Sequence, residues 1–80
     1  MPRKINDWSY QHVTDFLKEH GFVFFDELKG RRVWTKLQDD EPERFVELSI
    51  SSEKYSAKTM KSIIRQSGIV EKDWIDWAGS

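Results

Sequence analysis

The sequence predicts an α+β fold, in which a three-stranded antiparallel sheet carries two helices on one face and a short C-terminal helix follows. Two observations predict it. Apolar residues recur at helical spacing near both ends of the chain, and they alternate with polar residues in the stretch between. The 80 residues are expected to form one domain, residues 1–80, because chains of this length rarely divide into two cores. Four Trp, five Phe and two Tyr supply apolar surface for that core.

The first helix is predicted over residues 9–20. Ser9 is a suitable N-cap, apolar residues follow at helical spacing, and Gly21 stands where a left-handed residue commonly ends a helix. Trp8, just before the cap, is expected to pack on Val13 as a hydrophobic staple.

Three strands are predicted next. Phe22–Phe25 is a short apolar run, and Gly30 suits the turn that follows it. A second strand begins at Arg31, and a polar loop over residues 38–43 separates it from a third strand, Phe45–Ile50. The third strand is expected to point Val46, Leu48 and Ile50 inward, and Phe45, Glu47 and Ser49 outward.

The second strand has two different faces. Alternation puts Val33, Thr35 and Leu37 on one face and Arg32, Trp34 and Lys36 on the other. For Trp34 two interpretations stay open: it packs in the core, or it is exposed and stacks on nucleic-acid bases.

A second amphipathic helix is predicted over residues 57–66, with Ser56 as its N-cap and Gly68 as its stop. Its inward residues are Met60, Ile63 and Ile64, and a basic stripe of Lys58, Lys61 and Arg65 follows its solvent side. Residues 71–77 are expected to make the short third helix, with two tryptophans covering an edge of the core.

Positive charge is concentrated in two blocks, although the net charge is only −1. Residues 29–36 carry four basic and no acidic side chains, and so do residues 54–70, whereas the stretch between them is acidic. Local fields rather than net charge steer a polyanion to a surface, so two blocks brought together by folding could bind phosphate. For either block alone, the alternative is an ordinary surface on which charges of both signs are mixed.

Several function classes are excluded or disfavoured. The absence of cysteine excludes disulfides and thiolate metal sites, and no glycine-rich phosphate loop is present. His12 and His20 lie about 12 Å apart along one helix, too far to share a metal ion, so no metal and no cofactor are expected. No apolar run approaches the ~18 residues of a membrane span, so we expect a cytoplasmic protein with no membrane partner.

The segment Ser56–Ile69, which is SAKTMKSIIRQSGI, resembles the helix that closes members of the HicA toxin family. The junction His20-Gly21-Phe22 is similar to the family's junction between helix and strand, and the likeness covers nearly the whole chain. It implies an α-β-β-β-α fold similar to a double-stranded-RNA-binding domain. It also implies a metal-independent endoribonuclease (mRNA interferase) that acts on mRNA and is held inactive by a HicB antitoxin.

The chain departs from the family at the catalytic histidine, which members carry in a G-S-H motif at the start of the second strand. Residues 28–34 contain no histidine. A gap-free alignment from Gly21 puts Arg31 at that position, and alignment on Gly30 puts Arg32 there. Arginine binds phosphate but cannot act as a general base. Three explanations stay open: a member that binds without cutting, a member that uses another acid or base such as His12, or a deliberately inactivated variant.

The sequence therefore predicts a HicA-like toxin component that binds RNA, with catalytic residues unassigned. The alternative is an inactive module of the same fold that docks an antitoxin-like protein through its basic face. The residues expected to contact RNA are Arg31, Arg32, Trp34, Lys36, Lys58, Lys61 and Arg65.

Overall fold

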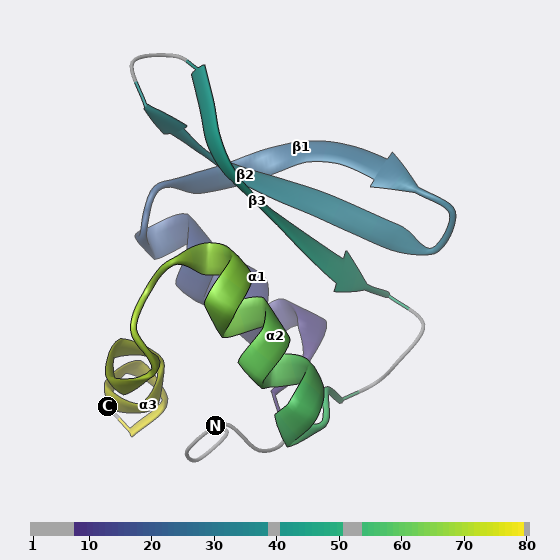
Figure 1. Cartoon of the computed structure of the whole chain (residues 1–80). Coiled ribbons are helices and arrows are strands. Elements are labelled where there is room, and N and C mark those ends of the chain that lie inside the picture. Colours follow the sequence, from purple (N-terminus) through teal and green to yellow (C-terminus); the bar gives the residue numbers. More distant parts are fainter. Residues whose placement is uncertain (1–7, 39–40, 51–53, 80) are drawn as a thin grey trace.

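The computed structural model describes residues 8–38, 41–50 and 54–79. The elements are, in chain order, α1 (Tyr10–Glu19), β1 (Phe22–Leu28), β2 (Arg31–Gln38), β3 (Glu41–Ser49), α2 (Ala57–Ser67) and α3 (Glu71–Gly79). The strands form one antiparallel sheet in the order β1-β2-β3, and α1 and α2 lie on the same side of it (Figure 1). The predicted α+β class and three-stranded antiparallel sheet are confirmed. Among the described residues, no helix is long and apolar enough to cross a membrane.

Both main helices begin and end at the predicted caps. The Ser9 and Ser56 hydroxyls each accept a hydrogen bond, at 3.2 Å, from a backbone N–H in the first turn of their helix. Gly21 follows α1 with φ +87°, and Gly68 follows α2 with φ +73°. A side chain at either glycine would be strained, because L-residues rarely adopt positive φ.

The core lies between the sheet and the helices and is closed by α3. Trp74 of α3 is fully buried and stacks on Phe16 of α1, with ring centroids 3.9 Å apart. Trp8 packs edge-on against Trp74, and Trp77 stacks on Trp8. The prediction that two tryptophans cover the core is confirmed, and Trp74 reaches its interior. Other buried members include Val13, Leu17, Phe22, Val46, Leu48, Met60, Ile63 and Ile64.

Several strand boundaries differ from the prediction. β1 extends to Leu28, with an irregularity between Phe24 and Asp26, because pairing with β2 continues through polar residues. β3 begins at Glu41 rather than Phe45 for the same reason, and residues 39–40 of the predicted loop lie outside the described residues. The inward orientation of Ile50 is wrong: β3 ends at Ser49, and Ile50 is 38% exposed.

Pairing with β3 decides which face of β2 meets the helices. Trp34 lies opposite Val46 and Arg32 opposite Leu48, so the Arg32, Trp34 and Lys36 face is the one covered by helices. Residues directly opposite each other in an antiparallel pair share a face, and Val46 and Leu48 are core residues. The other face has half-exposed aromatic side chains, with the Phe25 and Phe45 rings 5.2 Å apart.

Candidate nucleic-acid interface

Both main helices begin at one end of the molecule. The backbone N–H of Tyr55 donates to the carbonyl of Trp8 at 2.7 Å, which joins the residues that precede the two N-caps. The Tyr55 hydroxyl donates to the carbonyl of Ser49 at the end of β3. The N–H of Ile50 in turn donates to the carbonyl of Gly30 at 3.1 Å. We call this region the N-cap end: the starts of α1 and α2, the turn before β2 and the first residues of β2 (Figure 1).

The N-cap end favours anions through its backbone. A helix N-terminus has a partial positive charge from its free N–H groups and the aligned peptide dipoles. Neither α1 nor α2 has an acidic residue in its first turn, so no carboxylate in that turn offsets this charge. Two helix N-termini therefore add their fields at the same end.

Arg31 lies in a shallow groove between β3 and α2. The groove has a volume of about 290 Å³. Its lining residues are Arg31, Glu47, Ser49, Thr59, Ser62, Ile63 and Gln66. The Arg31 guanidinium is 3.9 Å from the Glu47 carboxylate, and their side chains are 64% and 49% exposed. Arg31, which belongs to the first basic block, therefore reaches the side of α2 that carries the Thr59 and Ser62 hydroxyls.

Arg32 lies on the opposite face of β2 and contacts both β1 and α1. Its Nε donates to Glu27 Oε1 at 2.9 Å, and its Nη1 donates to the Tyr10 hydroxyl at 3.4 Å. Hydrogen bonds to Tyr10 and then to Glu27 raise the pKa of Arg32 above its ordinary value. The guanidinium also lies 5.3 Å from the centre of the Tyr10 ring, in cation–π range. Arg32 is therefore a permanently charged group held beside the start of α1.

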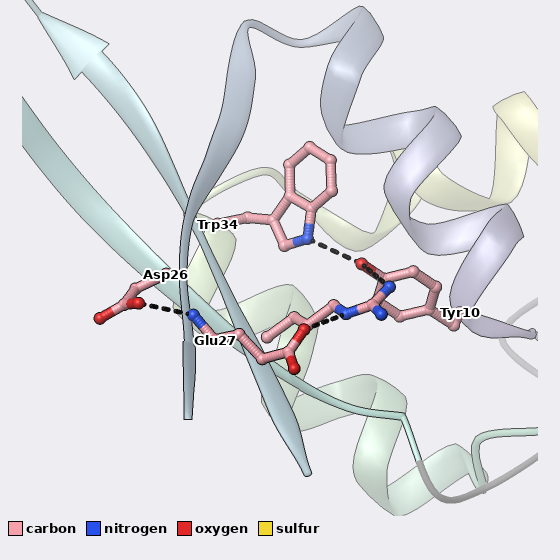
Figure 2. Close-up of polar contacts among 5 residues, drawn as sticks. Tyr10, Asp26, Glu27 and Trp34 are labelled. Carbon is pink, nitrogen blue, oxygen red and sulfur yellow. Dashed lines mark hydrogen bonds and ion pairs between the residues drawn. The ribbon is translucent and has the colours of Figure 1, made fainter. Parts of the chain in front are cut away.

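Tyr10 joins this contact to the core. Its hydroxyl accepts a second hydrogen bond from Trp34 Nε1 at 3.3 Å, as Figure 2 shows. The Asp26 carboxylate accepts from the backbone N–H of Glu27 at 2.8 Å in the same view. Among the described residues, the Tyr10 hydroxyl accepts two hydrogen bonds and donates none. Its own proton is thus available to a further acceptor.

Trp34 packs in the core, as the first of the two interpretations of this residue predicted. Only 6% of its surface is exposed, and it belongs to the core. The Phe24 ring meets it edge-on, and the Lys18 ammonium lies 5.6 Å from its ring centre. A base has no free face of Trp34 on which to stack in this conformation.

The remaining predicted contacts are distributed along the molecule. Lys58 is exposed in the first turn of α2, at the N-cap end, and Lys61 and Arg65 follow along the exposed side of that helix. Lys36 is half-buried and pairs with Phe22, at the other end of β2 from Arg31. Five residues of strand separate them by about 17 Å. The two basic blocks therefore meet only in part.

Both histidines have local structural partners. His12 Nδ1 lies 3.3 Å from the backbone N–H of Ser9 and completes the capping box of α1. His20 Nδ1 lies 2.9 Å from the Phe16 carbonyl, and its ring stacks on Phe16. Within the described residues, no group of three or more His, Asp or Glu side chains could hold a metal ion.

Sequence reasoning missed Tyr10 and Glu27. The position of Glu27 could have been predicted from the sequence. A two-residue turn at Lys29-Gly30 sets Leu28 opposite Arg31 and Glu27 opposite Arg32, as observed. Tyr10 carries no such signal, because its contact with Arg32 spans 22 positions and depends on how α1 packs on the sheet.

Neither the models of known protein families nor the curated proteins include a match to this sequence.

Proposed function

We propose that this chain is a HicA-like toxin component that binds mRNA and is inhibited by a HicB-like antitoxin. The support from sequence is the segment Ser56–Ile69 and the junction His20–Phe22. The order of elements from α1 to α2 agrees with the double-stranded-RNA-binding-domain-like fold that is part of this proposal. The geometry of the N-cap end supports its RNA-binding part.

One observation carries the proposal: Arg31 and Arg32 extend from opposite faces of β2 where both helices begin. Arg31 reaches the groove beside α2, and Arg32 reaches α1. A phosphodiester backbone that crosses this end meets two guanidinium groups, whose donors match phosphate oxygens, and two helix N-termini. Lys58, Lys61 and Arg65 extend the positive surface along α2.

The carboxylates that hold these arginines do not block this role. The Arg31–Glu47 and Arg32–Glu27 pairs are both solvent-exposed, with side-chain exposures between 39% and 64%. Exposed ion pairs are weak, because water screens the attraction and ordering two long side chains costs entropy. A phosphate with two anionic oxygens in a polyanion competes well for such a guanidinium.

The test is RNA binding measured by fluorescence anisotropy across a salt series. We expect the Arg31→Glu, Arg32→Glu double variant to bind at least about tenfold more weakly. The slope of log K against log salt should become shallower by about 1.4, or about 0.7 for each phosphate of a single strand that the variant no longer neutralises. Lys72→Glu is the matched control, because Lys72 is exposed at the start of α3, beyond the far end of α2. Salt-independent binding, or equal damage by the control, contradicts the proposal.

A second candidate function is docking of an acidic protein, without RNA, at the same end. It is favoured by one observation: both arginines already hold carboxylates, which are the groups an acidic partner would present. Pull-down with the full chain against total RNA and the product of the adjacent gene separates the two. Retention of the protein alone supports docking, and retention of RNA supports the first proposal.

A further inference from the structure

The groove that contains Arg31 lies along an edge of the sheet. β3 is an edge strand, and α2 lies beside it (Figure 1). At this edge the backbone N–H of Glu47 donates to Gln66 Oε1 at 2.9 Å instead of to a further strand. The groove volume of about 290 Å³ lies just below the ~300–1,000 Å³ typical of sites for drug-sized ligands, so the groove suits a ligand the size of one nucleobase.

Arg31 and Glu47 stand side by side in this groove. The closest atoms of the two charged groups, Nη1 and Oε2, are 3.9 Å apart, which is too far for a hydrogen bond. Neither charged group has another partner among the described residues, and both side chains are about half exposed or more. The groove therefore offers the donors of a guanidinium and the acceptors of a carboxylate to a single ligand.

The side of the groove formed by α2 adds neutral donors and an apolar surface. Because Gln66 Oε1 accepts from the Glu47 N–H, the Gln66 amide is oriented, and one Nε2 proton goes to the Ser62 hydroxyl at 3.3 Å. The second Nε2 proton and the Ser62 hydroxyl proton have no acceptor among the described residues. Ile63 lines the groove with an apolar side chain that the core holds in place.

We propose that this groove binds a guanine base of single-stranded RNA. The inference rests on the proposed RNA-binding function and names the base that is read. Glu47 accepts from the N1–H and N2–H groups of guanine, and Arg31 donates to O6 and N7. Proteins read unpaired bases through these two edges, and arginine on O6 and N7 is the commonest specific contact to guanine.

The pairing of donors and acceptors distinguishes guanine from the other bases. Guanine alone has two adjacent donors, which match the carboxylate oxygens, next to two acceptors, which match the guanidinium fork. Adenine would turn the N1 lone pair toward the carboxylate, and uracil has a single N–H between two carbonyl oxygens. Cytosine has an amino group next to an acceptor nitrogen. Each of these bases leaves a charged group of the protein without a partner, which costs affinity.

Base recognition by Arg31 is compatible with phosphate binding. A guanidinium has five N–H donors, and contacts to O6 and N7 use only two of them. The remaining donors are left for a phosphate of the same strand. Beside Glu47, in contrast, guanine N–H groups are attracted and a phosphate oxygen is repelled, which favours the base at this position.

The test measures base preference by fluorescence anisotropy with the full-length chain. The probes are short oligouridylates that carry one central guanosine, adenosine or inosine and are otherwise identical. We expect the guanosine probe to bind at least about tenfold more tightly than the adenosine probe, which lies within the discrimination of a good bidentate contact. Inosine lacks the N2 amino group, so the inosine probe should bind with intermediate affinity.

Two variants and a control assign the preference to the groove. Glu47→Gln should reduce the ratio of guanosine to adenosine affinity to less than about threefold, because a carboxamide has only one acceptor oxygen. Arg31→Lys should also reduce this ratio, because lysine keeps the charge but lacks the planar fork. Glu71→Gln, which changes an exposed carboxylate at the start of α3, should leave the ratio unchanged.

The possible outcomes separate the inference from the proposed function. Equal affinity for the guanosine and adenosine probes overturns the inference and leaves RNA binding standing. A preference for adenosine, an inosine probe that binds as tightly as guanosine, or a preference that survives Glu47→Gln does the same. A chain that binds none of the probes overturns both.

Discussion

Arg32 shows how much of a site depends on side chains from other elements. The sequence identifies it as a phosphate-binding candidate because it lies in a basic block near the position of a family histidine. The structure surrounds it with Glu27 from β1 and Tyr10 from α1. The first neighbour follows from the turn, and the second follows only from tertiary packing. A local pattern can therefore propose a charged residue but not its complete environment.

A pH-dependent stability is expected from Tyr55. Burial, with a smaller contribution from Tyr10, raises the pKa of Tyr55 to about 12 from an ordinary value near 10. Above pH 10 the unfolded chain loses this proton more readily than the folded chain. The stabilisation is therefore complete below pH 10 and is lost as the pH rises from 10 to about 12.

Urea unfolding at a series of pH values measures this effect. Tyr55→Phe should flatten the dependence on pH between 10 and 12, because phenylalanine has no proton to lose. An equally steep loss of stability in that variant would assign the alkaline transition to other groups.

Helices were predicted more accurately than strands. Each end of α1 and α2 depends on local chemistry: a serine that caps the first turn, or a glycine with positive φ that follows the last turn. The strands depend on pairing with other segments, and alternation alone does not show which face of β2 is covered. Both faces offer apolar residues, and the register with β3 selects the Trp34 face. The predicted RNA contacts were affected in the same way. Trp34 was predicted as a candidate contact but is buried, and Lys36 was grouped with Arg31 but lies at the other end of β2.

Helix α3 is expected to be necessary for stability. Trp74→Ala removes the stack on Phe16 and leaves a cavity, at a cost of about 3–5 kcal/mol. Trp74→Phe should cost less, because it keeps a ring and removes an indole N–H that has no hydrogen-bond partner among the described groups. Ile75→Ala, at a half-buried neighbour, is the control.

Urea denaturation followed by far-ultraviolet circular dichroism checks this order, because the signal does not depend on tryptophan. The expected order of destabilisation is Trp74→Ala, then Trp74→Phe and Ile75→Ala. A Trp74→Ala midpoint equal to that of Ile75→Ala would mean that α3 does not hold the core together.

At the scale of the whole molecule, the topology brings separate segments to one end. The bond between Trp8 and Tyr55 sets the starts of α1 and α2 together, and the Ile50–Gly30 bond adds the end of β3 and the turn before β2. Arg31, Arg32 and Lys58 all lie at this end, although Lys58 is far from the two arginines in the sequence. The face of the sheet that the helices do not cover is partly apolar, because Phe25 and Phe45 are half-exposed there.

RNA binding at the N-cap end is tested most directly by amide chemical-shift mapping, in which RNA is titrated into the isotope-labelled chain and followed by NMR. If RNA binds at the N-cap end, the largest changes fall in Gly30–Arg32, in the first turn of α1 and in Ser56–Thr59. Changes concentrated instead on the open sheet face, around Phe25 and Phe45, would contradict it.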